Sequence, residues 1–477
     1  MGRGGQVITR WRDQFLLSRI GQQLTGRTLK ARLIRGTGGT FVLRIGNTGL
    51  QFLTSLILAR WLGQEQFGVY NFALAWVTIL VVPSISGLDR LLIRNMAVYR
   101  SQLNWRMMRG LYRFANRFAI GTSVTLTVVG FGIGWTTYHF MGRPAFFNTP
   151  SPQLAETALV ALVIALLLLP LRTVLMLQQA AMQGLRHVVV GQVPEQLLQP
   201  LLFLLVASSL YLLSHATSSA TWASSVQVLT TLVALGVGVY LLQRRIPPSM
   251  RLASPQTQAR LWLIGALPFA ISRGLTILDT QINTLMVGAF STAEEVALYS
   301  VSQRVSQFII LLLMSANVAL APTIAELFSE GRRHDLQRVM TQGARVVLAG
   351  ALPIALVFFL FGKNILAIFG SQYPSAHGTL IILSVGQLIN ASTGLVGLLL
   401  LMTNREREAM LGIALGVGAH ILANLVLIPR WGIEGAAAGT AISLLLANLF
   451  QMGIAWKYLG IHTTVLGNMS WLRQRNG

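Results

Sequence analysis

Two arginines stand inside long apolar stretches of this sequence, Arg44 and Arg273. Arg44 is followed by Asn47, Gln51 and Thr54, and steps of three and four place these side chains on one face of a helix. An arginine at the centre of a bilayer costs at least about 2.5–3.5 kcal/mol unless it faces protein or water. Because its planar fork binds phosphate through two hydrogen bonds, these residues predict a hydrated, cationic cavity that suits an anion.

The stretch around the second arginine repeats the first at an offset of 273 − 44 = 229 residues. Three pairs of like residues are aligned by this offset: Arg44 with Arg273, Glu65 with Glu294, and Tyr70 with Tyr299. The second stretch carries its own polar stripe, formed by Thr276, Thr280 and Asn283. Helix packing is the alternative role for the Thr and Asn positions, whereas an Arg in both halves favours a cavity between them.

Carboxylates are scarce in the apolar stretches, and Asp279 is the clearest candidate for binding a coupling ion. Glu195 and Asp89 lie near the ends of such stretches. The alternative for Asp279 is that it only neutralises a neighbouring Arg.

The residue pattern does not support an enzymatic activity. The chain has no Cys, and its seven His are scattered without metal-ligand spacing. We find no nucleophile beside a plausible base and no glycine-rich phosphate loop. The sequence therefore predicts a protein that is not an enzyme and that holds neither a cofactor nor a metal.

The elements that must position these side chains are membrane-spanning helices. Hydrophobic residues make up 53% of the 477 residues and charged residues only 11%, against about 25% charged in soluble domains. Since a span needs about 20 apolar residues, we predict an all-α membrane protein with about twelve spans. They lie near 41–60, 69–88, 119–138, 156–177, 194–214, 222–242, 262–289, 297–323, 345–361, 376–402, 409–428 and 434–456.

Basic residues gather in alternate loops, and the formal net charge is +23. The positive-inside rule places these loops, and both termini, in the cytoplasm. Basic residues in alternate loops indicate membrane topology and do not indicate nucleic-acid binding. Equivalent positions are six spans apart, so the halves form two parallel bundles around a central cavity. The predicted units are a basic, amphipathic or disordered segment 1–40, a first lobe 41–242, a linker 243–260, a second lobe 261–458 and a tail 459–477.

Several strings resemble the polysaccharide (O-antigen type) flippases of the multidrug/oligosaccharidyl-lipid/polysaccharide exporter superfamily. The resemblance covers about residues 38–460. The strings run from Leu58 to Tyr70, Gly87 to Arg90 with Arg94, Leu267 to Asp279, Ala297 to Tyr299, Ala321 to Ala325, Phe369 and Gly370 with Tyr373, and Asn424 to Ala437. Each is weak alone, and their order and spacing make the resemblance specific.

The resemblance implies a transporter that moves a polyprenyl-pyrophosphate-linked oligosaccharide from the inner to the outer leaflet by alternating access. At the matching positions, Arg44 and Arg273 would attract the pyrophosphate, and Arg90 and Arg94 would lie at the cytoplasmic mouth. Polarity adds Arg304 and candidates for binding sugar hydroxyls, which are Asn47, Gln51, Asn283 and Gln307. The expected partners are the lipid-linked substrate, the bilayer of the bacterial inner membrane and polysaccharide assembly proteins.

Three other functions compete with this interpretation. An ion-coupled drug or cation antiporter of the same superfamily would want carboxylates in its spans, whereas the balance here is cationic. A peptidoglycan-precursor flippase would carry extra spans. A membrane glycosyltransferase or polymerase would need acidic or His residues on sizeable exterior loops, and the longest predicted exterior loop, 141–153, is too short to form a domain.

Overall fold

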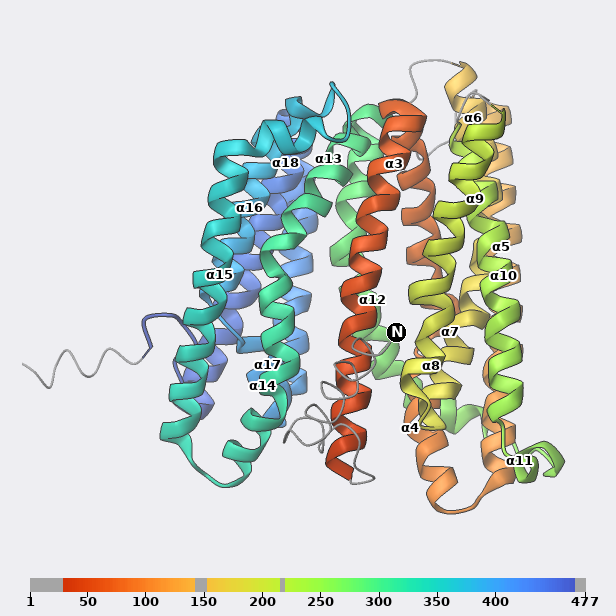
Figure 1. The fold of residues 1–477 in the computed structure, drawn as a ribbon, viewed down its shortest axis with the longest axis vertical. Helices are drawn as coiled ribbons and strands as arrows, with labels where there is room; N and C mark the ends of the chain where they lie inside the picture. The colour runs from red at the N-terminus through yellow and green to blue at the C-terminus, as the bar shows by residue number, and fades with distance from the viewer. Residues whose placement is uncertain (1–28, 142–151, 215–218, 468–477) are drawn as a thin grey trace, which may run out of the picture.

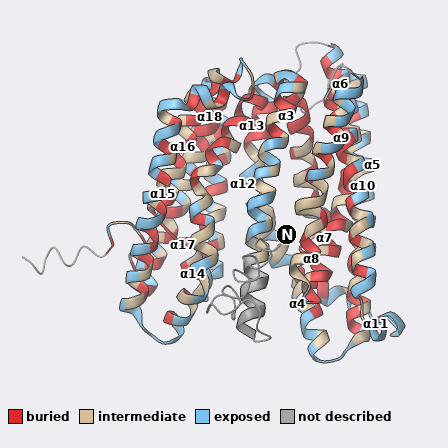
Figure 2. Ribbon diagram, viewed as in Figure 1, coloured by how far each residue is buried: buried red, intermediate tan, exposed pale blue. Residues whose placement is uncertain are grey.

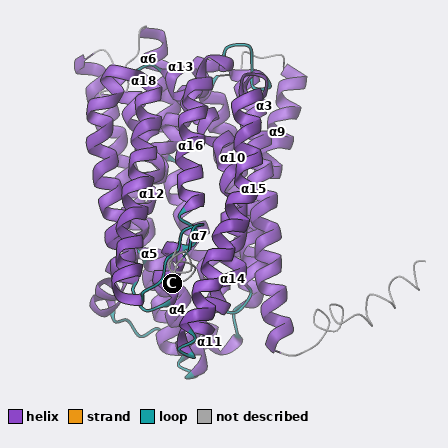
Figure 3. Ribbon diagram, turned by 90° about the vertical axis from the view of Figure 1, so that its left-hand side faces the viewer, coloured by secondary structure: helices purple, strands orange, loops and turns teal. Residues whose placement is uncertain are grey.

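The computed structural model describes residues 29–141, 152–214 and 219–467, and within these ranges every regular element is helical (Figures 1 and 3). The all-α prediction is thereby confirmed. Most of the predicted N-terminal segment 1–40 lies outside the described residues, as do residues 468–477 of the predicted tail. Residues 29–40 are the first turns of a long helix.

The described residues of the first half form α3 (Leu29–Ile85), α4 (Leu88–Ser101), α5 (Trp105–Met141), α6 (Pro152–Leu166), α7 (Leu168–Gly184), α8 (Val188–Val193), the π-helical turn η1 (Pro194–Leu198), α9 (Gln199–Ser214) and α10 (Ala220–Arg245). The short helix α11 (Pro248–Leu252) lies in the predicted linker. Its segment is held against α5, where the Gln256 amide donates to the Arg106 carbonyl at 3.1 Å.

The second half contains α12 (Ala259–Phe290), α13 (Ala293–Ser306), the 3-10 turn η2 (Gln307–Ile310), α14 (Leu311–Ser329), α15 (Arg333–Ala367), the 3-10 turn η3 (Tyr373–Ala376), α16 (His377–Ser392), α17 (Val396–Met402) and α18 (Glu406–Leu459). Local sequence sets the helix starts. At α13 the Thr292 hydroxyl accepts the Glu295 amide at 3.4 Å, and two glutamates in the first turn complement the positive end of the helix dipole.

Two of the long helices are interrupted at glycines. Gly63 in α3 has φ 73° and Gly432 in α18 has φ 53°, which is backbone that glycine adopts without strain. In α18 the segments on either side of the break lie together, because a Cβ at Gly439 would meet the Asn424 side-chain oxygen at 2.1 Å. Figure 1 shows α3 turning back in the same way at its upper end. Each is therefore a pair of antiparallel helices.

Counting these pairs recovers the predicted number of spans in the described residues. Nine helices are long and apolar enough to cross a membrane, and the bent pair α16–α17 makes a tenth. Dividing α3 and α18 adds one each, which gives twelve. The bend of 42° between α16 and α17 breaks a span predicted as continuous over 376–402. Large apolar side chains such as Leu205 and Leu422 are exposed, as expected for surfaces that lipid covers. Figure 2 shows exposed positions, in pale blue, along outer helices such as α15 and α10.

The described part of the predicted tail packs against the second half. Ile461 and Thr463 are buried, and the amide of Gln337 in α15 donates to the His462 carbonyl at 2.6 Å. The Val465 amide donates to the Ser392 carbonyl, at the break between α16 and α17. Residues 460–467 therefore pack into the bend between α16 and α17.

The helices form two lobes with matching interiors, α3–α10 on one side and α13–α18 on the other (Figure 1). Helix α12 packs Trp262 and Ala266 into the core of the first lobe and then continues into the second. Tyr70, on the second span of its lobe, donates to Gln227 on the sixth span at 3.3 Å. Tyr299 is its equivalent, and its hydroxyl contacts Thr440 on the last span of its own lobe at 3.2 Å. Both tyrosines are buried, so the predicted parallel repeat is visible in the packing.

The lobes touch at both ends of the bundle. At the end away from the basic loops, Gly68 of α3 lies directly against the Ala293 backbone, and the Arg60 side chain donates to the Ile368 carbonyl at 2.6 Å. At the end that carries the basic loops, which we call the basic end, an ion pair of 2.8 Å joins Arg273 of α12 to Asp89 of α4. Burial, with the positive charges of Arg245 and Arg100, lowers the pKa of His187 there.

We expect Gly68→Ala to weaken the contact between the lobes. The added Cβ would lie 1.7 Å from the Ala293 carbonyl oxygen, so backbone must move, at a cost of about 1–3 kcal/mol. Thermal unfolding of the purified protein in detergent should show a lower midpoint. Gly49→Ala on the same helix, where nothing lies within 4 Å of the new Cβ, is the control and should be neutral or stabilising. An equal response of both variants would contradict this contact.

We also expect Arg273→Met to destabilise the protein more than the double variant Asp89→Asn/Arg273→Met. The Asp89 side chain is only 8% exposed, so losing its partner leaves a nearly buried charge, which costs about 2 kcal/mol or more. A double-mutant cycle on thermal unfolding measures the coupling. Strictly additive effects of the two single changes would mean that the pair carries no coupling.

Candidate functional site

Two connected chambers lie between the lobes. The larger chamber has a volume of about 680 Å³ and is lined mainly by α3, α4, α7, η1 and α12. The smaller chamber has a volume of about 410 Å³ and is lined by α3, α7, α9, α10, α12, α13 and η2. Gln51, Thr78, Arg172 and Gln199 border both, so the two volumes are continuous. Sites of this size accommodate small-molecule ligands and headgroups.

Positive charge dominates the larger chamber. Its charged lining residues are Arg44, Arg90, Arg172 and Arg273, against Asp89 and Glu195. Asp89 is already engaged by Arg273 at 2.8 Å. The lining is otherwise rich in glutamine amides from α7 and η1, which can donate to and accept from a polar ligand. The predicted cationic cavity is therefore present at the lobe interface.

The smaller chamber carries two arginines, Arg172 and Arg304, and no Asp or Glu among its lining residues. Arg304 donates to the Gln51 carbonyl at 3.3 Å and to the Asn71 side chain at 3.1 Å. These bonds join α13 of the second lobe to α3 of the first. The remaining polar lining consists of neutral hydroxyl and amide groups.

Most of the residues predicted to bind substrate line these chambers. Arg44, Asn47, Arg90 and Arg273 border the larger one, Arg304 and Gln307 border the smaller one, and Gln51 borders both. Part of the polar stripe also serves packing. The Asn47 amide donates to the Gln196 carbonyl at 2.7 Å and accepts from Gln51 at 2.8 Å. The stripe therefore lines the chambers and also makes packing contacts within the first lobe.

Two predicted residues lie elsewhere. Arg94 is exposed on α4, one turn beyond Arg90, and lines neither chamber. Asn283 is 1% exposed and points into the interior of the second lobe. The offset between the halves pairs Asn283 with Thr54, which does line the smaller chamber. The two polar stripes therefore diverge at this step, because α12 bears a second polar face.

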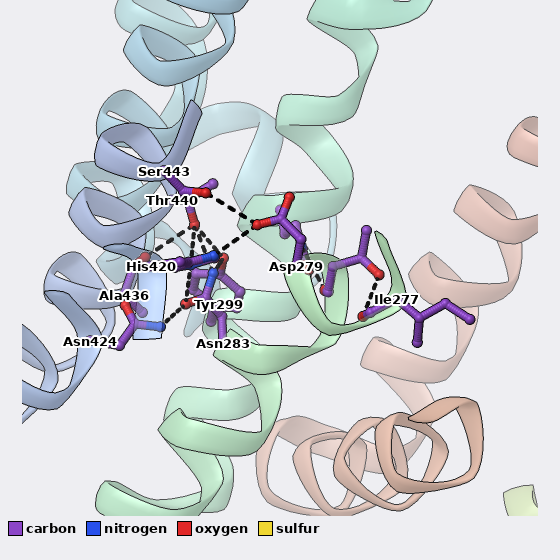
Figure 4. Close-up of polar contacts among 11 residues, drawn as sticks. Ile277, Asp279, Asn283, Tyr299, His420, Asn424, Ala436, Thr440 and Ser443 are labelled. Atoms are coloured by element: carbon purple, nitrogen blue, oxygen red, sulfur yellow. Dashed lines mark hydrogen bonds and ion pairs between the residues drawn. The ribbon is translucent and has the colours of Figure 1, made fainter. Parts of the chain in front are cut away.

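The second polar face of α12 belongs to a buried cluster (Figure 4). His420 Nδ1 lies 3.1 Å from Asp279 Oδ1, and its Nε2 lies 3.0 Å from Asn283 Oδ1. The Ser443 hydroxyl donates to Asp279 Oδ1 at 3.2 Å, and the Asn424 amide donates to Asn283 Oδ1 at 2.7 Å. His420 is buried and Asp279 is 35% exposed. The structure thus pairs Asp279 with a histidine and gives Arg273 a different partner, Asp89.

Sequence reasoning missed two residues of consequence. Arg172 lies within the apolar span predicted at 156–177, so the argument applied to Arg44 could have found it. His420 is 141 residues from Asp279 along the chain, and no spacing rule joins them. Among the described residues, no three His, Cys, Asp or Glu side chains come together as a metal site.

Two family models match the chain. The model of the polysaccharide biosynthesis protein family matches residues 33–328, which is more than half of the chain. The MatE model matches residues 268–426. The second match covers α13 to α17 and most of the buried cluster.

Proteins named as flippases are among the curated relatives of this chain. "Probable flippase AglR" of Haloferax volcanii is 29% identical over 175 residues, which are 36% of this chain and 37% of that protein. "Probable lipid II flippase MurJ" of Bdellovibrio bacteriovorus is 23% identical over 243 residues, 49% of this chain and 46% of that protein. The matched segments thus span less than half of each relative.

Solved structures share the fold over most of the chain. An inward-facing multidrug resistance MATE family transporter superposes with a TM-score of 0.71 at 13% identity, covering 88% of this chain and 98% of the other. The lipid II flippase MurJ in an inward closed conformation gives 0.68 at 11% identity, covering 88% and 87%. This likeness establishes the two-lobe helical fold. Since the family model spans more than half of its length, the chain belongs to the polysaccharide biosynthesis protein family.

Proposed function

We propose that this protein flips a polyprenyl-pyrophosphate-linked oligosaccharide from the inner to the outer leaflet by alternating access. The observation that carries the proposal is the pair of connected chambers between the lobes, where five arginines outnumber two carboxylates. Relatives whose names describe flippases support it. Exporting such units would supply the cell with surface polysaccharide.

The chemistry of the cargo fits these chambers. A pyrophosphate carries about two negative charges, and moving it unaided through hydrocarbon is prohibitive. Hydrated guanidinium groups replace its lost water with charge-assisted hydrogen bonds. The lipid tail stays in the bilayer while the headgroup crosses between the lobes. No covalent bond is made or broken, so the proposed activity is transport and not catalysis.

Three of the four arginines that line the larger chamber have a proposed role. Arg44 and Arg273 bind the pyrophosphate, and Arg90 lies at the entrance used by the headgroup. Gln51 and Gln307 offer amides to sugar hydroxyls in the smaller chamber. We assign no substrate contact to Arg94 or Asn283, because neither lines a chamber.

The orientation follows from the basic end, which we place in the cytoplasm together with both termini. The proposed membrane is the bacterial inner membrane. Residues 41–242 and 261–458 would act as rocking units, joined by the linker 243–260. Polysaccharide assembly proteins are the expected protein partners.

Ion coupling is assigned to the buried cluster of the second lobe. Asp279 is held by His420 and Ser443 and keeps one carboxylate oxygen outside those bonds, so a proton or a cation can reach it. An ion-coupled antiporter of drugs or cations remains the alternative, and this cluster is the observation that favours it. The cationic lining of the chambers favours an anionic cargo.

Arg44→Ala should abolish export of the surface glycan, because it removes a cavity charge that the pyrophosphate needs. Arg44→Lys should restore part of the export if charge matters and little if the bidentate fork is required. Glycan display on cells that express equal amounts of each variant measures the effect. Arg117→Ala, an exposed arginine on α5 outside both chambers, is the matched control. Full glycan display on cells that express Arg44→Ala would contradict the proposal that the cavity arginines bind the pyrophosphate.

Asp279→Asn should leave substrate binding intact and remove the dependence of transport on an imposed ion gradient. The amide keeps the size of the side chain but neither ionises nor attracts a cation. Flipping in proteoliposomes, with and without proton and sodium gradients, measures it. If the variant responds to gradients like the wild-type protein, the coupling ion binds elsewhere.

A further inference from the structure

Arg172 has no role in the cargo path described so far. It projects from α7 and lines both the larger and the smaller chamber, at the point where they join. Within the described residues it makes no hydrogen bond or ion pair, whereas Arg273 is held by Asp89 at 2.8 Å. The charge of Glu195 attracts Arg172 without a hydrogen bond between them, so the N–H donors of this guanidinium remain available to a ligand.

Arg304 is the second positive charge of the smaller chamber. Its two recorded bonds go to the neutral oxygens of Gln51 and Asn71. A guanidinium carries five N–H donors, so donors remain for a ligand. Neither Asp nor Glu lines this chamber, and Arg304 forms no ion pair within the described residues.

Arg304 has no carboxylate partner among the described residues, and Arg172 has only Glu195, which lines the larger chamber and not the smaller one. A positive charge that is not fully neutralised is costly inside a bundle surrounded by hydrocarbon. Neutral sugar hydroxyls do not need these charges, because amide and hydroxyl groups such as Gln227, Gln303 and Ser300 already line the smaller chamber. An anionic group is the ligand that a pair of guanidinium forks recognises. The pyrophosphate already has Arg44 and Arg273 in the other chamber.

We propose that the smaller chamber is a second anion-binding site, in which Arg172 and Arg304 hold the carboxylate of an acidic sugar in the cargo. This inference rests on the proposed function, since it places the glycan in the smaller chamber while the pyrophosphate occupies the larger one. It narrows the substrate class to oligosaccharides that carry a negatively charged sugar. The same forks could instead receive the pyrophosphate itself, and the experiment separates these two sources.

The test compares three ligands on the purified protein by titration calorimetry: a prenyl pyrophosphate without sugar, one linked to a disaccharide of glucose, and one linked to a disaccharide that ends in glucuronic acid. We expect Arg172→Gln and Arg304→Gln each to weaken binding of the glucuronate ligand about tenfold or more, the loss expected for one charge-assisted contact. Binding of the other two ligands should change less than about twofold. Arg117→Gln, the same substitution outside both chambers, should alter none of the three.

Three results would overturn the inference. Equal weakening of all three ligands would mean that these arginines bind the pyrophosphate. Unchanged binding of the glucuronate ligand would mean that they bind no part of the cargo, while the proposed function stands. Failure of the wild-type protein to bind any of the three would remove the proposed function together with this site. If the glutamine variants fail to fold, Arg172→Lys and Arg304→Lys, which keep the charge, are titrated with the same three ligands.

Discussion

The cost of placing a guanidinium among helices that lipid surrounds is the constraint on which this architecture depends. Each such charge must face water, a carboxylate or a ligand. The structure uses these solutions at different arginines. Arg273 has Asp89, and Arg304 has neutral oxygens of α3. Arg172 makes no hydrogen bond among the described residues and is attracted by the charge of Glu195 in the larger chamber. A single compact bundle would leave these groups dry, whereas two lobes leave chambers between them. The division into two lobes therefore gives these arginines a chamber to face in place of hydrocarbon.

The same charges also join the lobes. Arg273 and Arg304 belong to the second lobe, and their partners Asp89, Gln51 and Asn71 belong to the first. An anion that binds Arg273 competes with Asp89 for the guanidinium. Under the proposed function, cargo binding would therefore weaken a contact between the lobes at the basic end. At the other end the contact is steric, with Gly68 against the Ala293 backbone, and no anion competes for it. Substrate would act on one end of the interface only.

The sequence predicted what depends on apolar length and periodicity, and missed what depends on distant contacts. Twelve spans and the repeat of Arg44 at Arg273 follow from patterns within one stretch of chain. The turn at Gly63 lies in the predicted loop between the first two spans, as the pattern required. The stripe pattern predicts a cavity position for Asn283, but α18 packs on that face of α12 and buries this side chain. No pattern along the chain predicts that His420 lies beside Asp279, because the two residues are 141 positions apart.

Helix α12 is the element that connects the two polar regions. Arg273 and Ile277 line the larger chamber, and Thr280 lines the smaller one. Asp279 and Asn283 project instead into the cluster around His420, on the side away from Ile277 (Figure 4). Because one rigid helix bears both faces, an ion that changes the contacts of Asp279 acts on the same helix that carries Arg273. In the proposed cycle, coupling therefore needs no long chain of intermediates: a shift or rotation of α12 moves the ion site and the cargo site together.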